Sequence, residues 1–553
     1  MNSDDLLYSA LVIVAVLSHQ DPLIAQNSRL DEFYRSDRVQ TIRLQVAAAD
    51  RQRMLNALPK RIYVPATFQW RDVTVDNVAV RFKGNSSSQP NQKHKRSFLI
   101  KFDRFNADGR FFGLRRVSFD NGIQFGSLFS EPVITGILRD QGLPTHRCNY
   151  ARLYLNDRYQ GVYVNVERID ESFLDQHWPE SKGALFKVDE GGPGSNLQFL
   201  GEDPSAYSRA FEPKNETAEK EAARLVDLIR MIHQSPQPDF RKQLAARLEI
   251  DDFLRVTAVM LFSGAFDQLT GWNPHNYYLH HDRKSGRWRY LPWDLDVGFS
   301  ETAFGKIQVL EDWHAAWPVP RDGSPNPLLE RVLADPELLQ SYRRTARMML
   351  ERYFEPERLC GIIDAKYALI RQDLRNDPFP HRRVTNPDDR DYGDVVESMK
   401  SFVRKRYTRA VQQLENPGQR PRPAPRRPQG PEPAPGPASK DAPTRLQAMG
   451  VSATSVTLHW KDNAENEAGS ILQRAAGEQG GEFQNLIGQP GDGMIRATDR
   501  NIQPGKTYRY RVYAVHPTPD GLKGTGVSNV VTVHIPGQDG NDCCAAALDD
   551  LIE

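Results

Sequence analysis

The segment HNYYLHHDRKSGRWRYLPWDLDVGFS, residues 275–300, decides where this chain folds back on itself and where its chemistry lies. Two runs of alternating aromatic and polar residues flank a turn at residues 284–286, a pattern typical of a β-hairpin. The second run ends on Asp294 and Asp296, whose side chains would share one strand face about 6.6 Å apart. At an effective dielectric near 20, their repulsion is roughly 2–3 kcal/mol. Carboxylates placed in this way bind a cation, pair with a basic residue or point into water.

Length and charge limit the class of protein. The chain has 553 residues, which is enough for two or more domains with their own cores. Its 72 Lys and Arg residues balance 71 Asp and Glu residues, so we expect no nucleic-acid partner and no basic membrane-binding surface. Four cysteines without a CxxC pair exclude a disulfide scaffold. Cys148 and Cys360 form either a bridge or, as we favour, two buried thiols.

The first 26 residues have the pattern of a signal peptide. Residues 6–17 (LLYSALVIVAVL) form an apolar run of twelve, shorter than the ~20 residues that a membrane span needs. Asp4 and Asp5 precede this run where signal peptides carry basic residues, so a plain N-terminal helix or a misplaced start is the alternative. We expect a secreted or cell-surface protein without a transmembrane span after signal removal; otherwise it is cytoplasmic.

A proline-rich segment at residues 417–441 divides the rest of the chain. It has too few apolar residues to fold, and we expect an extended linker. Residues 442–536 contain short period-two runs separated by turns, which predict an antiparallel immunoglobulin-like sandwich of roughly seven strands. Trp460 is expected in its core, and Tyr508 is a candidate tyrosine corner. We expect residues 537–553 to be a mobile tail.

The large part before the linker, residues 35–416, has strands first and helices later, so we predict an α+β domain. The expected strands and hairpin lie at residues 42–46, 74–82, 97–102 and 152–166. The expected helices lie at residues 131–141, 219–233, 253–266 and throughout 326–414.

No serine-hydrolase elbow, Walker loop or HExxH zinc motif occurs in the chain. The turn Gly84-Asn85-Ser86-Ser87 could instead cradle phosphate oxygens with its backbone N–H groups, although many such stretches are plain turns. Lys95 and Lys101 share one face of the strand that follows. A lysine that points into a core needs an anion, and the alternative is that both reach solvent.

The stretch that leads into the hairpin completes the candidate site. Asp267 ends an apolar helix and Asn276 begins the first hairpin strand. The oxygen donors of Asn276, Asp294 and Asp296 suit a hard cation, Mg²⁺ before Ca²⁺, rather than zinc.

The order of these parts is that of a protein kinase, and residues 35–416 resemble the spore-coat protein H-like (CotH) kinase family. The stretches that carry the resemblance are RFKGNSSSQPNQKHKRSFLIKFD (81–103), GLPTHRCNYARLYLNDRYQGVYVNVERID (142–170), HNYYLHHDRKSGRWRYLPWDLDVGF (275–299) and NPLLERVLADPELLQSYR (326–343). Residues 442–536 resemble a fibronectin type III domain, through LHWKDNAENE (458–467) and YRYRVYA (508–514). Such domains bind a surface or matrix ligand, or act as spacers.

The kinase resemblance implies an atypical, two-lobed protein-kinase-like domain with a mostly β N-terminal part and a mostly α C-terminal part. It implies transfer of the γ-phosphoryl group of ATP, with Mg²⁺ or Mn²⁺, to hydroxyls of an extracytoplasmic protein. The implied roles are a metal-binding Asp294, a metal- or phosphate-binding Asn276, a catalytic Asp267, a phosphate-binding Lys95 or Lys101, a phosphate-covering turn at Gly84 to Ser87, and Glu167 beside the adenine.

Some features depart from the family pattern. Asp267 and Asn276 are nine residues apart, more than in the common kinase loop, and no His-Arg-Asp precedes them. Glu131 stands near a helix start that often carries a basic residue in this family, and could pair with the strand lysine. Two alternatives follow: a catalytically degenerate structural or adhesive surface protein with a fibronectin type III binding module, and a metal-binding protein without nucleotide.

Overall fold

The computed structural model of the chain describes residues 22–84, 86–90, 95–122, 127–189, 191–303, 308–320, 326–379, 389–421, 434–453, 455–464, 469–486, 496–499, 502–518 and 521–537. The chain divides into two units, one up to residue 424 and the other from residue 425. The division lies inside the proline-rich segment. The first unit is mixed α and β, as predicted, with most of its strands before most of its helices.

Seven strands of the first unit close into a barrel in the order β1-β2-β3-β4-β5-β7-β6. Neighbours are antiparallel except β1 and β6, which are parallel and complete the closure. The strands are β1 (Val39–Gln45), β2 (Val64–Trp70), β3 (Val73–Lys83), β4 (Ser97–Lys101), β5 (Arg116–Asp120), β6 (Cys148–Leu155) and β7 (Arg158–Glu167). Alternate residues of β2 are buried, because every second side chain of a barrel strand points inward.

The sequence predicted β1, β3, β4 and the β6–β7 hairpin at nearly their observed positions. The hairpin turns at Asn156 and Asp157, whose φ angles are 49° and 62°. These two residue types tolerate the left-handed conformation that a two-residue hairpin turn requires. β2 and β5 were not predicted. β5 has only five residues, and Pro65, a residue that is rare inside strands, interrupts the otherwise alternating run of β2.

A second sheet of the first unit has the order β11-β10-β8-β9, built from β8 (Leu185–Val188), β9 (Glu212–Pro213), β10 (Tyr277–Asp282) and β11 (Arg287–Pro292). The β10–β11 hairpin is confirmed, with Tyr277 opposite Pro292 and Asp282 opposite Arg287. All residues of β10 are buried, because β8 and β11 flank it and helices cover the sheet.

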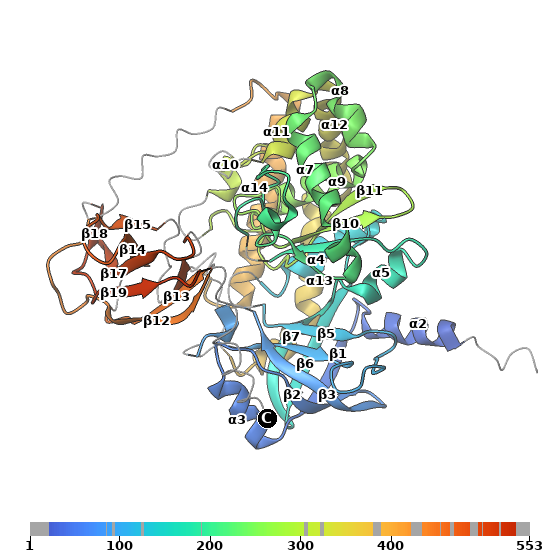
Figure 1. The fold of residues 1–553 in the computed structure, drawn as a ribbon. Helices are drawn as coiled ribbons and strands as arrows, with labels where there is room; N and C mark the ends of the chain where they lie inside the picture. The colour runs from blue at the N-terminus through green and yellow to red at the C-terminus, as the bar shows by residue number, and fades with distance from the viewer. Residues whose placement is uncertain are drawn as a thin grey trace, which may run out of the picture. The chain divides into compact units, whose positions relative to one another are not determined.

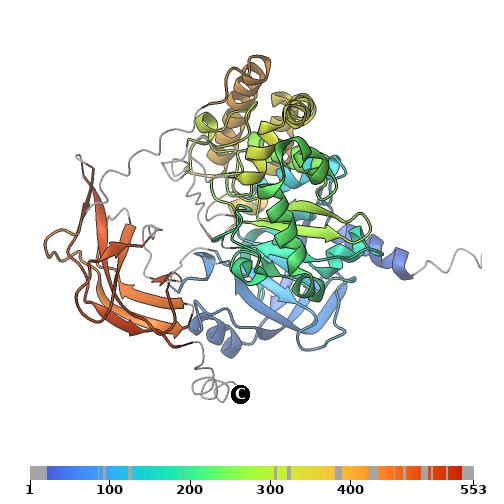
Figure 2. The ribbon, with the colours of Figure 1, turned by 45° about the horizontal axis from the view of Figure 1, so that its top comes forward.

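The helices of the first unit lie mostly on the side away from the barrel strands, as Figures 1 and 2 show. They are α2 (Pro22–Phe33), α3 (Ala48–Asn56), α4 (Ser130–Asp140), α5 (Glu171–His177), α6 (Glu216–Lys220), α7 (Ala222–Gln234), α8 (Gln237–Ala245), α9 (Ile250–Ser263), α10 (Val309–Asp312), α11 (Pro327–Ala334), α12 (Pro336–Tyr353), α13 (Pro356–Arg375) and α14 (Tyr392–Glu415). The helix predicted at residues 219–233 is two helices, because Glu221 leaves the helical conformation between α6 and α7.

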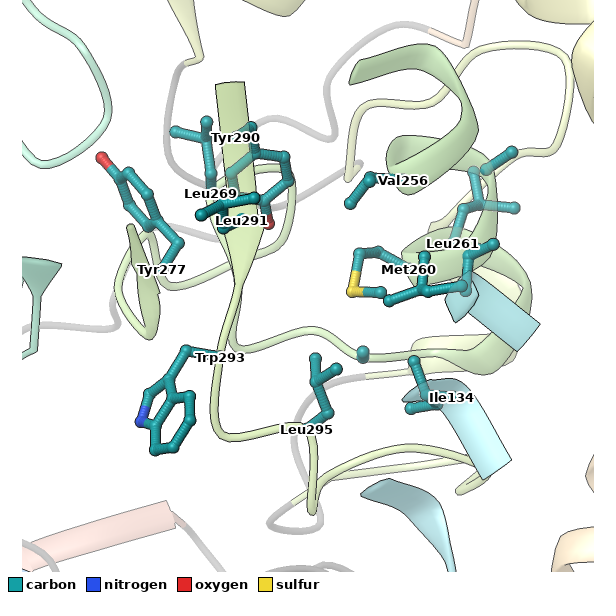
Figure 3. Packing of buried hydrophobic residues seen from close by; sticks show 14 of the residues in the cluster. Ile134, Val256, Met260, Leu261, Leu269, Tyr277, Tyr290, Leu291, Trp293 and Leu295 are labelled. Carbon is teal, nitrogen blue, oxygen red and sulfur yellow. The ribbon is translucent and has the colours of Figure 1, made fainter. Parts of the chain in front are cut away.

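Helix α9 is buried along most of its length and positions the loop that follows. It ends at Gly264, whose φ of 68° lets the N–H groups of residues 264 and 265 cap the last carbonyls. A Cβ atom at this position would lie 2.9 Å from Phe402. In Figure 3, Leu295 points toward the side of the cluster that holds Ile134 and Met260, and the Trp293 ring points away from it.

Two ion pairs, one of them fully buried, join the barrel to the end of α13. The Lys95 Nζ atom lies 2.6 Å from the Asp377 carboxylate and donates to the carbonyl of Val162, and both side chains of the pair are almost completely buried. Asp377 also accepts from the backbone N–H of Val162. Arg152 pairs with Asp373 at 2.6 Å. Because these contacts bridge distant parts of the sequence, they hold the β-rich part against the helices.

The second unit contains two antiparallel sheets, β12-β13-β16 and β15-β14-β17-β18, with β19 paired to β17. Its strands are β12 (Thr444–Ser452), β13 (Ser455–Lys461), β14 (Gly469–Ala476), β15 (Gln484–Asn485), β16 (Arg496–Asp499), β17 (Thr507–Thr518), β18 (Gly521–Gly524) and β19 (Val531–His534). Trp460 is fully buried, as predicted, in a core that both sheets share. The Tyr508 hydroxyl accepts from the backbone N–H of Gln503, which fits a tyrosine corner.

Two further expectations can be compared with the described residues. Cys148 and Cys360 are buried free thiols and not a bridge. No helix in the described part of the chain is long and apolar enough to span a membrane.

Asp377→Ala should lower the free energy of unfolding by about 3–5 kcal/mol, because it leaves the buried Lys95 ammonium without its carboxylate. Denaturant unfolding of the full chain measures this change. Arg390→Ala removes an exposed ion pair to Asp394 and should cost less than about 1 kcal/mol. Equal losses in the two variants would contradict the role given to the buried pair.

His280 should make the fold sensitive to acid. Its ring is fully buried against Trp178, with a centroid distance of 4.1 Å, and neither ring nitrogen has a partner among the described residues. Burial lowers its pKa to about 3; Arg289, His281 and His177 act in the same direction and Asp282 opposes them. Below the ordinary histidine pKa of about 6.5, the unfolded chain binds a proton that the folded chain does not.

Stability should therefore fall as the pH drops from about 6.5 toward 3, at up to roughly 1.4 kcal/mol per pH unit. His280→Leu should flatten this part of the stability profile, measured by denaturant unfolding at a series of pH values. The same slope in wild type and variant would exclude His280 as its source.

Candidate functional site

The β10–β11 hairpin places two candidate ligands side by side. Asn276 precedes β10 and Asp294 follows Trp293 at the end of β11. The Trp293 N–H donates to the Asn276 carbonyl at 2.9 Å, which extends the hairpin by one pair. Both Asn276 and Asp294 have positive φ angles, 54° and 57°. Because Asn and Asp tolerate this conformation best among non-glycine residues, both can leave the strands at the rim of a cavity.

This site cavity has a volume of about 480 Å³. It collects six of the residues predicted from the sequence: Gly84, Ser87, Asp267, Asn276, Asp294 and Asp296. Residues from the barrel, from β8 and from the loops around the hairpin complete its wall, among them Lys83, Asp120, Arg168, Lys187, His275 and Trp293.

Asp267 is held by three side chains of the loop that follows it. Its carboxylate accepts from the amides of Asn273 at 3.2 Å and Asn276 at 3.0 Å. The Nδ1 atom of His275 lies 2.9 Å from the same carboxylate. Burial lowers the pKa of His275, but Asp267 outweighs burial and raises it above the ordinary value. The long loop thus orients Asp267 and bonds it to Asn276.

The site concentrates negative charge. Burial, together with the nearby Asp120 and Glu131 carboxylates, raises the pKa of Asp294 to about 6, although Lys83 and Lys187 oppose the shift. Burial also raises the pKa of Asp296 well above its usual range, with Asp294 as the strongest charged neighbour. The two carboxylates therefore resist being charged together. The expectation that they share one strand face is wrong, because β11 ends at Pro292 and Asp294 has a positive φ angle.

A divalent cation fits this donor set. Among the described residues, no group of three or more His, Cys, Asp or Glu side chains forms a ready metal cluster. Two carboxylates and the Asn276 amide are nevertheless the hard oxygen donors that Mg²⁺ uses, and Mg²⁺ usually completes its shell with water and phosphate oxygens.

The lysines at the cavity are not those predicted. Lys83, at the end of β3, pairs with Asp120, and Lys187 on β8 pairs with Asp189. Burial lowers the pKa of Lys187, Arg168 adds to this, and Asp189 and Asp294 oppose it. Lys95 is instead buried against Asp377. Lys101 lies 3.6 Å from Asp103 and does not line the cavity.

The sequence contained one signal for Lys83: it ends a strand directly before the glycine turn. Lys187 lies in a strand that was not predicted. The shared face of β4 was interpreted correctly in part, because Ser97 and Leu99 of that face do line the cavity.

The turn after β3 is tightly closed. Gly84 has a φ of 83°, and a Cβ atom there would lie 2.6 Å from the Ser87 hydroxyl oxygen. The hydroxyls of Ser87 and Ser88 donate to the Lys83 carbonyl at 2.5 and 3.2 Å. Asn85 and the side chain of Ser86 lie outside the described residues. The turn lines the cavity, but the Ser87 and Ser88 hydroxyls already donate their hydrogen bonds to the Lys83 carbonyl within the turn.

Two glutamates have partners away from the cavity. Glu167 forms a buried ion pair with Arg147, which lowers the pKa of Glu167 although burial alone would raise it. It does not line the cavity, whereas its neighbour Arg168 does and lies over the Trp293 ring at 4.4 Å. Glu131 pairs with His146 at 2.9 Å and not with a strand lysine.

The cavity thus combines carboxylates, an amide and two lysines, a composition that suits a divalent cation together with an anionic ligand. A family model described as "CotH kinase protein" matches residues 80–409. Because this match covers more than half of the sequence, the chain belongs to the CotH kinase protein family.

Individual proteins and structures show more distant similarity. "Inner spore coat protein H" of Bacillus subtilis (strain 168) is 24% identical over 317 residues, which are 57% of this chain and 82% of that protein. The solved structures "Myokine structure" and "Crystal structure of the FN5 domain of Drosophila Lar" are 18% and 19% identical. Each covers 18% of this chain and 99% of the other, with a TM-score of 0.15, which supports no conclusion about the fold.

Asp294→Asn should raise the free energy of unfolding in the absence of divalent cations by about 1–2 kcal/mol, because it removes one of two opposed buried charges. Asparagine also keeps the size and the positive φ of this position. The stabilisation by Mg²⁺ that we expect for the wild type should disappear.

Denaturant unfolding with EDTA and with Mg²⁺ measures both effects. Asp364→Asn, at an exposed carboxylate of α13 paired with Lys400, is the matched control and should show no gain. A variant at position 294 that is less stable than wild type in EDTA would contradict the charge argument.

Proposed function

We propose that the chain is an atypical protein kinase that transfers the γ-phosphoryl group of ATP to hydroxyls of an extracytoplasmic protein. The observation that carries this proposal is the meeting of Asp267, Asn276 and Asp294 with Lys83 and Lys187 around one cavity. Phosphoryl transfer needs mainly positioning and charge stabilisation, and these residues supply both. Membership of the CotH kinase protein family supports the same activity.

Each residue has a proposed task. Asp294 and Asn276, with Asp296 beside them, would hold Mg²⁺ or Mn²⁺, which neutralises phosphate charge when bound. Lys83 or Lys187 would contact the phosphates in place of the predicted Lys95 and Lys101. The Gly84 turn would cover the phosphates.

Asp267 is the proposed acceptor of the substrate hydroxyl proton. Its bonds from Asn273, His275 and Asn276 hold the carboxylate in one orientation. General-base catalysis depends on such fixed geometry.

We further propose a two-lobed kinase-like arrangement for the first unit and a fibronectin type III module for the second, which would bind a surface ligand or act as a spacer. The name of the Bacillus subtilis relative supports a secreted or surface location, where the signal peptide would direct the chain.

A structural surface protein without catalysis is the second candidate. It is favoured by the ion pairs that already occupy Lys83 and Lys187, since each amine must turn from its carboxylate to meet a phosphate. The name of the relative, a spore coat protein, also fits this candidate.

An assay of phosphoryl transfer from labelled ATP to a panel of proteins, with Mg²⁺ or Mn²⁺, distinguishes the kinase from the non-catalytic surface protein. Asp294→Ala and Asp267→Ala should each abolish transfer, and Asp364→Ala should not change it. Thermal unfolding should show joint stabilisation by ATP and metal in wild type and none in Asp294→Ala. Unchanged transfer in Asp294→Ala, or no joint stabilisation of wild type, would overturn the kinase assignment.

A further inference from the structure

The first unit carries a second and larger hollow, the α4 groove, with a volume of about 1040 Å³. It lies between α4, the end of α12, α13 and the segment that follows α2. None of its lining residues lines the site cavity. The residues that the proposed kinase reaction uses therefore lie outside this groove.

Basic side chains dominate the groove. It is lined by Arg35, Arg139, Arg147, Arg352, Arg358 and Lys366, against Asp31, Asp37 and Asp140. Asp31 is paired with Arg147 and Asp37 with Arg35. Two of the three acidic residues are thus already neutralised by groove residues.

The other four cations, Arg139, Arg352, Arg358 and Lys366, form no ion pair with any carboxylate that the structure describes. Three of them donate to backbone carbonyls: Arg139 to Thr145 at 3.0 Å, Arg358 to Arg352 at 2.6 Å, and Lys366 to Ser36 at 3.1 Å. A carbonyl holds such a side chain in place but does not neutralise it. Burial lowers the pKa of Lys366, as expected for an ammonium group that lacks a close anion.

The floor of the groove is partly apolar. Val133 and Ile137 of α4 line it with only 1% and 4% of their surface exposed, and Ile362 of α13 keeps 38% of its surface exposed. Gly136 lies in the middle of α4, where glycine weakens a helix relative to alanine. A Cβ atom at Gly136 would meet nothing within 4 Å, so packing does not require the glycine. It leaves the floor free for another molecule.

From these observations we propose that the α4 groove binds an acidic protein segment that also carries apolar side chains. Carboxylates of the segment would meet the four unpaired cations, and its apolar side chains would cover the floor beside Gly136. Charge complementarity of this kind selects the partner and speeds association. The apolar floor favours a peptide over a nucleic acid, which would present mainly phosphates. This inference does not depend on the proposed kinase activity.

Binding of a labelled synthetic peptide of repeated Asp-Leu-Glu units to the full chain tests the proposal, with fluorescence anisotropy as the readout. The double variant Arg358→Glu with Lys366→Glu should weaken binding by about tenfold or more, and added salt should weaken wild-type binding. Arg51→Glu on α3, outside the groove, is the charge control and should bind as wild type does.

A second variant changes the shape of the groove and not its charge. Gly136→Leu should fill the floor and abolish peptide binding while the helix stays at least as stable. Gly361→Leu is its matched control, because that glycine also lies in a helix with open space at Cβ but does not line the groove. Both variants should keep or raise the thermal unfolding midpoint of wild type, because leucine favours a helix over glycine.

Three outcomes would overturn the proposal. The first is peptide binding that survives both the charge reversal and Gly136→Leu, and the second is the absence of peptide binding by wild type. The third is tighter binding of a labelled single-stranded oligonucleotide that depends on the same residues, which would show a groove for nucleic acid.

Discussion

The backbone hydrogen bond from Trp293 to Asn276 is the contact on which the candidate site depends. It adds one more pair to the β10–β11 ladder, so the residues that would hold a cation leave the two strands at the same end. The positive φ angles of Asn276 and Asp294 then turn both residues out of the strand path. A shift of register by one residue would exchange the two faces of the hairpin and move Asp294 out of the cavity. Buried aromatic residues on both strands, including Tyr277 and Tyr290, fix this register.

The buried charges of the scaffold and those of the candidate site differ in how well their surroundings stabilise them. The buried Arg406 guanidinium donates to three backbone carbonyls, and Lys95 meets both a carboxylate and a carbonyl. The carboxylate of Asp377 balances the Lys95 charge, whereas carbonyls hold the Arg406 guanidinium in place without neutralising it. The Asp294 and Asp296 carboxylates are opposed by each other and only partly balanced by lysines. Such an unbalanced cluster costs stability, and it is a common mark of a site that gains its balance from a ligand.

The three donors around Asp267 show how a long loop can still place one carboxylate. Nine positions separate Asp267 from Asn276, and a flexible connection of this length would leave both side chains free. Instead, the side chains of Asn273 and His275 contact the Asp267 carboxylate, so Asp267 itself holds the loop in one conformation. Helix α9, capped by Gly264, supplies a rigid starting point for the loop. Local hydrogen bonds thus fix the Asp267 carboxylate although the loop is long.

The sequence by itself determined the local features of this protein: the β10–β11 hairpin, most of the barrel strands, the glycine turn after β3, the buried thiols and the acidic residues of the site. Period and turn chemistry are local properties, so a pattern of neighbouring residues is enough to predict them. Only the tertiary structure decided which lysine meets the cavity. Lys95 pairs with Asp377, 282 positions later in the chain, and therefore lies away from the cavity. The pairing of the barrel strands places Lys83 in the same cavity as Asp294. The closure of the barrel through β1 and β6 could not be predicted from the sequence either. Contacts between distant segments depend on the packing of the whole core and not on the order of residues within one segment.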